Sequence, residues 1–255
     1  MNIGITERGD AGIDLSWFPK LSRVDGCILI TKNLTDACIE KIKESSKPII
    51  LHCTCTGWGG TIMEPNVPVY EEQFRQLEKL LEQGFNPERV VLRLDPIIPN
   101  MQGLEKADQV LTRLETLNNW YKSFSEQPIT RVRISILDEY KYVKQRFYEA
   151  GLDPVYGDDF YPQEEQIKAV AELLKKHPGF TYESCAEPIL AKYTDCVTAT
   201  GCVSQKDLQL MGLSYDQGAV NGQGRYGCLC LRCKTELLTN RHRCPHQCLY
   251  CYWKD

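Results

Sequence analysis

The stretches Arg89-Val90-Val91-Leu92-Arg93-Leu94-Asp95 and Thr130-Arg131-Val132-Arg133-Ile134-Ser135-Ile136 decide the fold of this chain. In both, apolar side chains alternate with others, as in a β-strand whose successive side chains point to opposite faces of a sheet. One face is wholly apolar, whereas the other becomes polar towards the carboxyl end, at Arg93, Asp95 and Ser135. A sheet covered by helices on both sides would be apolar on both faces. A barrel accounts for the pattern, because helices cover its outside and polar residues line its mouth.

Further segments with strand character alternate with amphipathic helical patterns along the chain. The predicted strands are Asn2–Thr6, Gly26–Thr31, Pro48–Thr54, Arg89–Asp95, Thr130–Ile136 and Gly179–Cys185. The predicted helices are Thr35–Glu44, Glu71–Gln83, Leu104–Tyr121, Glu139–Ala150, Gln163–Lys176 and Gln205–Met211. Such alternation predicts an α/β fold with a parallel sheet and right-handed crossovers. We predict a partial TIM-like barrel of six strand–helix units over residues 1–195. An open doubly wound sheet whose polar residues are exposed at an edge fits the same strand count.

Cysteine is the unusual residue, with 13 in 255 positions, and nine of them fall between Cys185 and Cys251. The sequence opens with no basic, apolar leader and contains no run of about 20 apolar residues, so we expect a cytoplasmic protein without membrane association. In that reducing compartment, thiols indicate metal ligation or redox chemistry rather than disulfides. Residues 196–255 are therefore predicted to be a cysteine-rich segment of the same domain that closes the barrel mouth.

The formal net charge of -4 argues against a protein that coats nucleic acid. We therefore expect no direct binding of nucleic acid, and a small-molecule substrate instead.

The motif that carries chemistry is Cys244-Pro245-His246-Gln247-Cys248-Leu249-Tyr250-Cys251, which has the spacing C-x3-C-x2-C. Three thiolates in a compact loop can bind three irons of a 4Fe–4S cluster. The fourth iron then keeps an open coordination position, which is where a small molecule can bind a metal.

A zinc knuckle is the alternative interpretation of this motif, because thiolates also suit zinc. Zinc needs a fourth ligand, which His242, His246 or Cys233 could supply. In that case the protein would recognise a ligand without turnover.

The triad spacing and the aromatic Tyr250 before its last cysteine resemble the signature of the radical S-adenosylmethionine superfamily. The resemblance implies a full or partial barrel and a cluster that binds the amino and carboxylate groups of S-adenosylmethionine. It implies reductive cleavage of that molecule to a 5′-deoxyadenosyl radical, and an electron donor such as flavodoxin or ferredoxin. The superfamily usually carries its triad after the first strand. Here the triad comes late, which indicates a non-standard branch whose tail folds back across the barrel mouth.

A second resemblance covers nearly the whole chain. A large bacterial family pairs a short barrel with a C-x3-C-x-Y-C-Y ending. The matching residues are Asp10, Trp17-Phe18, Thr31-Lys32-Asn33, Thr56-Gly57-Trp58-Gly59, Glu64-Pro65-Asn66-Val67-Pro68, Arg93-Leu94-Asp95-Pro96, Cys185, Gly201-Cys202, Cys228-Leu229-Cys230 and Tyr250-Cys251-Tyr252. Among radical enzymes with such a late cluster, queuine lyases cut the carbon–nitrogen bond of queuine and release 7-aminomethyl-7-deazaguanine for queuosine salvage. The resemblance implies this lyase activity on a deazaguanine base, with another small molecule or a nucleotide as the alternative substrate.

Polar residues at the predicted barrel mouth are candidate ligand contacts. An arginine suits the carboxylate of S-adenosylmethionine, and one carboxylate can accept from both the ring N–H and the exocyclic amine of a deazaguanine. The predicted cofactor contacts are Arg93, Arg133 and Ser135, and the predicted substrate contacts are Asp10, Asp95 and Glu183. The alternative is an internal network of arginines and carboxylates that holds the barrel together.

A second metal site is predicted from the remaining late cysteines, Cys185, Cys202, Cys228 and Cys230. Zinc or an iron–sulfur cluster bound there would anchor the returning tail, because metal ligation supplies folding free energy where apolar packing is thin. Alternatively these thiols are small buried apolar residues.

Overall fold

A computed structural model describes residues 1–123, 127–185, 187, 189–215, 228–239 and 244–252. Its centre is one sheet of eight strands in the order β7-β6-β5-β4-β3-β2-β1-β8, and every neighbouring pair is parallel. The strands are β1 (Ile3–Ile5), β2 (Gly26–Thr31), β3 (Ile49–Thr54), β4 (Val90–Ile97), β5 (Arg131–Ile136), β6 (Thr181–Cys185), β7 (Val197–Thr200) and β8 (Lys234–Glu236).

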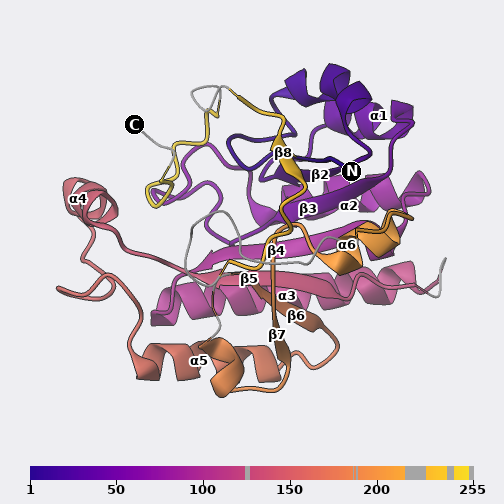
Figure 1. Cartoon of the computed structure of the whole chain (residues 1–255). Helices are drawn as coiled ribbons and strands as arrows, with labels where there is room; N and C mark the ends of the chain where they lie inside the picture. Colours follow the sequence, from indigo (N-terminus) through magenta and orange to yellow (C-terminus); the bar gives the residue numbers. More distant parts are fainter. Residues whose placement is uncertain (124–126, 186, 188, 216–227, 240–243, 253–255) are drawn as a thin grey trace.

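Helices cover the sheet unequally (Figure 1). The α-helices are α1 (Asp36–Glu44), α2 (Tyr70–Glu82), α3 (Met101–Tyr121), α4 (Lys141–Glu149), α5 (Glu164–Lys175) and α6 (Gln205–Leu210). Three 3-10 helices join them, η1 (Leu15–Arg23), η2 (Pro87–Arg89) and η3 (Leu190–Lys192). Helices α1, α2, α3 and α5 pack on one face of the sheet, whereas α6 packs on the other. Among these described helices, none is long and apolar enough to cross a membrane.

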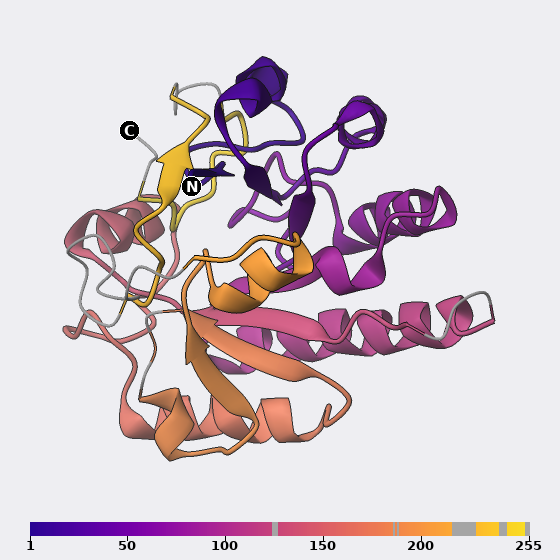
Figure 2. The same ribbon diagram turned by 45° about the vertical axis from the view of Figure 1, so that its right-hand side comes forward.

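The strand order follows the chain from β1 to β7, and β8 returns to the free side of β1. This sequential order is that of a barrel, yet no ladder joins β7 to β8 in the described ranges, so the sheet is open there. Figure 2 shows the yellow strand β8 well apart from the orange strand β7. The α/β class and the parallel sheet are confirmed, while closure into a barrel remains a prediction. The six predicted strands are present, and β7 and β8 are additional.

The strand alternation predicts the two faces correctly. Leu51 and Leu92 belong to the large core under the outer helices. Ile50 and Val91 pack with α6 in a second core on the inner face. The inner face is apolar near the amino ends of β1 to β4, and it becomes charged from Arg93 onwards in β4 and already at Arg131, the first residue of β5.

A buried charge network occupies the inner face where β5, β6 and α6 meet. Arg131 donates to both carboxylate oxygens of Glu183 at 3.0 and 3.1 Å and to Asp207 of α6 at 2.7 Å. Arg133 donates to Glu183 as well. Burial alone would raise the pKa of Glu183, but the charges of Arg133 and Arg131 outweigh it, and that pKa is lowered. Arg133 and Glu183 therefore belong to an internal network of arginines and carboxylates, which is the alternative to ligand contacts that the sequence analysis left open.

Glu183→Gln should destabilise the fold by about 3–5 kcal/mol, because it leaves two buried guanidinium groups short of a carboxylate. Because the folded-state pKa of Glu183 is lowered, its carboxylate contributes this stabilisation fully at pH values above the unfolded-state pKa of about 4.3. The stabilisation is lost as the pH falls through the folded-state pKa. Urea unfolding should thus show a constant gap between wild type and variant from about pH 6 to 8 that narrows below about pH 4.

The matched control is Glu164→Gln, which removes an exposed ion pair with Lys168. This variant should unfold at the same urea concentration as the wild type, because exposed ion pairs contribute little to stability. Equal stability of Glu183→Gln and wild type would show that Glu183 is not held by the network and is available to a ligand.

Candidate metal centre

The cysteine loop, defined here as residues 244–252, lies against segments that follow the carboxyl ends of the strands. The amide of Leu249 donates to the carbonyl of Met63 at 3.0 Å, in the segment after β3. Arg146 of α4 donates to the carbonyl of Cys251 at 2.7 Å. In Figure 1 the yellow segment runs beside the purple loops that follow β2 and β3. The cysteine loop, although late in sequence, therefore contacts the segments that follow the carboxyl ends of β3 and β5.

The first anchor of the cysteine loop is Asp10, which follows β1. Its buried carboxylate accepts from the amides of Gly12 and Lys32 at 2.8 and 2.7 Å and from the hydroxyl of Thr31 at 2.6 Å. The ring Nε2 of His246 lies 2.7 Å from the same carboxylate, and its Nδ1 lies 3.0 Å from the carbonyl of Asn66. Carboxylates and carbonyls only accept hydrogen bonds, so Asp10 and Asn66 offer one acceptor to each ring nitrogen of His246.

The second anchor is a cluster around Glu64, which is 1% exposed. Its Oε1 accepts from Lys32 at 2.7 Å, from Thr56 at 2.8 Å and from the hydroxyl of Tyr250. Lys32 also donates to the Tyr250 hydroxyl at 2.8 Å. Burial lowers the pKa of Lys32, but the charges of Glu64 and Cys248 outweigh it and raise that pKa, which keeps the amine charged. A permanent cation therefore lies beside the thiol of Cys248.

The three thiols of the loop share one environment. Cys248 is 5% exposed and packs with Trp58 and Met63, whereas Cys244 and Cys251 are half-buried. Burial, with the charges of neighbouring groups, raises the pKa of Cys244 to about 11 and that of Cys248 to about 12. These thiols thus become thiolates readily only when a metal takes up their charge.

The residues predicted as the fourth ligand of a zinc knuckle lie in different places. The proposed zinc ligand His246 is taken up by Asp10 and Asn66, Cys233 packs on the inner-face core, and His242 lies outside the described residues.

The predicted cofactor and substrate contacts divide into three places. Asp95 accepts from both Ser135 and Arg93, and its charge is felt by Lys32, so these residues lie together at the mouth near the cysteine loop. Arg133 and Glu183 lie in the buried network. Asp10 is the anchor for His246. The roles of all six as ligand contacts stay predictions.

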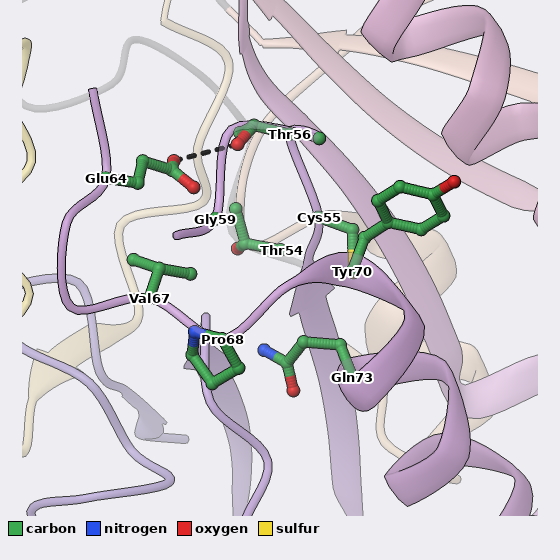
Figure 3. Close-up of a pocket in the computed structure, with 10 residues that line it drawn as sticks. Thr54, Cys55, Thr56, Gly59, Glu64, Val67, Pro68, Tyr70 and Gln73 are labelled. Carbon is green, nitrogen blue, oxygen red and sulfur yellow. Dashed lines mark hydrogen bonds between the residues drawn. The ribbon is translucent and has the colours of Figure 1, made fainter. Parts of the chain in front are cut away.

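A small pocket lies between the end of β3 and the start of α2 (Figure 3). Glu64 points towards Thr56 on one side, and Gln73 of α2 approaches from the other. The amide Nε2 of Gln73 is buried and has no hydrogen-bond partner in the described part of the chain. The empty volume, open space at the mouth included, is about 180 Å³. Pockets for drug-sized ligands measure about 300–1,000 Å³, so this one alone does not hold a nucleoside cofactor.

The predicted second metal site is partly assembled. The thiols of Cys202 and Cys230 and the carboxylate of Glu7 lie within 4.8 Å of one another. Cys228 packs nearby on the inner-face core, and the side chain of Cys185 lies outside the described residues. Glu7 was not predicted as a member of this site.

Sequence reasoning singled out Lys32, Glu64, His246 and Tyr250 but did not predict that they seat the cysteine loop. It missed Arg146 altogether. Lys32 directly follows a predicted strand, and a polar residue there faces the mouth of a parallel sheet. The position of Lys32 could therefore have been predicted from the sequence. Its partners could not, because they come from loops that are distant in the sequence.

An α/β protein with a cysteine loop at the carboxyl ends of a parallel sheet is the class that these observations define. The profile of a family described as "Domain of unknown function (DUF1848)" matches residues 17–253, and the chain belongs to this family. No curated protein and no solved structure matches the chain.

Asp10→Asn should loosen the cysteine loop while the sheet stays folded, because it removes the charge that holds His246. A hydrogen bond to a charged group contributes about 1.5–3 kcal/mol, so amide exchange in residues 244–252 should accelerate roughly 10–100-fold. Hydrogen-exchange mass spectrometry measures this. Asp14→Asn is the control: it alters a neighbouring carboxylate that caps η1, and loop exchange should match wild type. Unchanged protection in Asp10→Asn would disprove the anchor.

Proposed function

We propose that this protein is a radical S-adenosylmethionine enzyme whose 4Fe–4S cluster is held by Cys244, Cys248 and Cys251. The observation that carries the proposal is the place of the cysteine loop: it lies over the carboxyl ends of the parallel strands, beside Lys32 and Asp95. This is the end of an α/β sheet where ligands bind. When bound, the cluster and S-adenosylmethionine would together supply a 5′-deoxyadenosyl radical.

The chain's own residues support such a site in two ways. Lys32 places a positive charge near Cys248, which would stabilise the thiolates that a cluster requires. The packing of Cys248 and Tyr250 against Trp58 and Met63 excludes water from one side of the loop. Dry surroundings suit radical chemistry because they limit side reactions.

We also propose that the open sheet is a partial barrel whose mouth is closed by the cysteine-rich segment 196–255. The sequential strand order and the return of β8 to β1 support this architecture. The protein would work in the cytoplasm, with an electron donor such as flavodoxin or ferredoxin.

For the substrate we propose queuine, with cleavage of its carbon–nitrogen bond and release of 7-aminomethyl-7-deazaguanine. Of the two strand carboxylates considered for the base edge, Asp95 is the more accessible, with a side chain 26% exposed against 7% for Glu183. Glu183 is also engaged by two arginines. Asp95 is therefore the better candidate to accept from the base.

Cys244→Ala, Cys248→Ala and Cys251→Ala should each abolish reductive cleavage of S-adenosylmethionine, because each removes the ligand of one iron. The anaerobically purified wild type should contain about four irons per chain at this site. Iron analysis, circular dichroism and chromatography of 5′-deoxyadenosine measure metal, fold and turnover. The control is Cys27→Ala, a buried thiol of the outer core, which should keep its iron. Full cleavage by any triad variant, or a colourless zinc-only wild type, would reject the radical class.

Under anaerobic, reducing conditions the wild type should convert queuine and S-adenosylmethionine into 7-aminomethyl-7-deazaguanine and 5′-deoxyadenosine. Asp95→Asn should raise KM for queuine roughly tenfold or more, since a charge-assisted hydrogen bond is lost, while slow uncoupled formation of 5′-deoxyadenosine continues. Mass spectrometry follows both products. If 5′-deoxyadenosine accumulates in the wild type without any base product, queuine is the wrong substrate and the radical class stands.

A further inference from the structure

Two cysteines distant in sequence meet on the inner face of the sheet. Cys202 follows β7, and Cys230 precedes β8; their thiols lie within 4.8 Å of each other and of the Glu7 carboxylate, just after β1. Cys202 is 6% exposed and Cys230 is 2% exposed. The three donors therefore come from three separate strand connections and converge on one point.

The backbone is built to bring these two segments into contact. A Cβ atom on Gly201 would lie 2.5 Å from both the Cα and the amide nitrogen of Cys230, so only glycine fits there. The amide of Leu231 donates to the carbonyl of Val203 at 3.0 Å and fixes the register of the two segments. The approach of Cys202 to Cys230 thus follows from the main chain rather than from a flexible side chain.

Backbone amides are directed at the sulfur of Cys230, although the neighbouring thiol of Cys202 and burial raise the pKa of that thiol. The amide of Cys202 donates to the Cys230 sulfur at 3.1 Å, and the amide of Val203 is directed at the same sulfur. Amide donors stabilise the negative charge of a thiolate. Glu7 is held by Lys234, whose Nζ lies 3.1 and 2.9 Å from its two oxygens. Metal-ligating carboxylates are commonly fixed by such a second residue.

We propose that Cys202, Cys230 and Glu7 bind one zinc ion. Two soft thiolates and a carboxylate form a donor set that zinc accepts, and water completes a tetrahedral shell. The close grouping of the donors suits a single ion. An iron–sulfur cluster would need more thiolates than the two that the described residues bring together here.

The site joins the two ends of the open sheet. No ladder connects β7 to β8 in the described ranges, yet Cys202 leaves β7 and Cys230 leads into β8. A bound zinc would bridge these two connections and attach both to the end of β1 through Glu7. The free energy of binding would reinforce the single bond from Leu231 to Val203 at a place where the described ranges show no strand ladder. The ion is structural and takes no part in the chemistry proposed for the cysteine loop.

The first experiment uses the full-length protein, purified anaerobically and loaded with iron. Metal analysis should find one zinc per chain in addition to iron, and zinc K-edge absorption should show two sulfur neighbours at about 2.3 Å. Cys202→Ser and Cys230→Ser should each lower zinc to less than a tenth of the wild-type occupancy. Cys38→Ser, a buried thiol of the outer core, should leave zinc unchanged.

A second variant tests the site without removing a donor. Gly201→Ala should separate the two segments and weaken zinc binding at least tenfold, measured by competition with a chelator of known affinity. Gly179→Ala is the matched control, because a Cβ there meets no atom within 4 Å. Added zinc should raise Tm by several degrees in wild type and Gly179→Ala, and by less in Gly201→Ala.

Zinc bound by the cysteine loop is excluded by repeating the zinc titration in the variant Cys244→Ala/Cys248→Ala/Cys251→Ala, which lacks the three thiols of that loop. One zinc per chain in that variant supports the site whether or not the triad holds a cluster. The proposal is overturned if no zinc binds there, if Cys202→Ser binds as much zinc as wild type, or if extra iron replaces zinc. A Cys202–Cys230 disulfide in anaerobically purified protein would also overturn it.

Discussion

The contact between Asp10 and His246 joins parts of the chain that are 236 positions apart, and the geometry of the candidate site depends on it. Asp10 also holds the amides and the hydroxyl that shape the turns after β1 and β2. Those turns admit little change, since a Cβ on Gly12 would lie 1.8 Å from the carbonyl oxygen of Asn33. One buried carboxylate thus positions the backbone of Lys32 from one side and the cysteine loop from the other.

Buried charges on the inner face form two separate groups with different consequences. The deeper group, around Arg131, Glu183 and Asp207, connects α6 to the sheet. The group at the mouth includes Lys32 and Asp95, and it borders the cysteine loop. Replacing a closed buried network by apolar residues is often neutral for stability, whereas removing one partner is costly. The deeper group therefore constrains the fold, and the group at the mouth is better placed to meet a ligand.

Much of the fold follows from local patterns, whereas the site follows only in part. Alternation in Arg89–Asp95 predicts β4 and the faces of its side chains, because a strand repeats every two residues. Strand β7 escapes this logic, since its middle residues are exposed on both faces, and β8 has only three residues. Spacing identifies the cysteine triad. Alternation cannot predict that Arg131 binds Asp207 of α6, because it assigns a side chain to a face and does not identify the neighbour that packs against that face.

The pairing of β8 with β1 has a consequence for the order in which the molecule assembles. The first seven strands are joined by connections between neighbours in sequence, whereas β8 must find a partner from the opposite end of the chain. Contacts between distant segments form slowly, because the chain loses entropy before the contact stabilises it. The cysteine loop, which follows β8, therefore reaches its seat after the rest of the sheet is in place. Under the proposed function, delivery of the cluster and this last step of folding would compete in time.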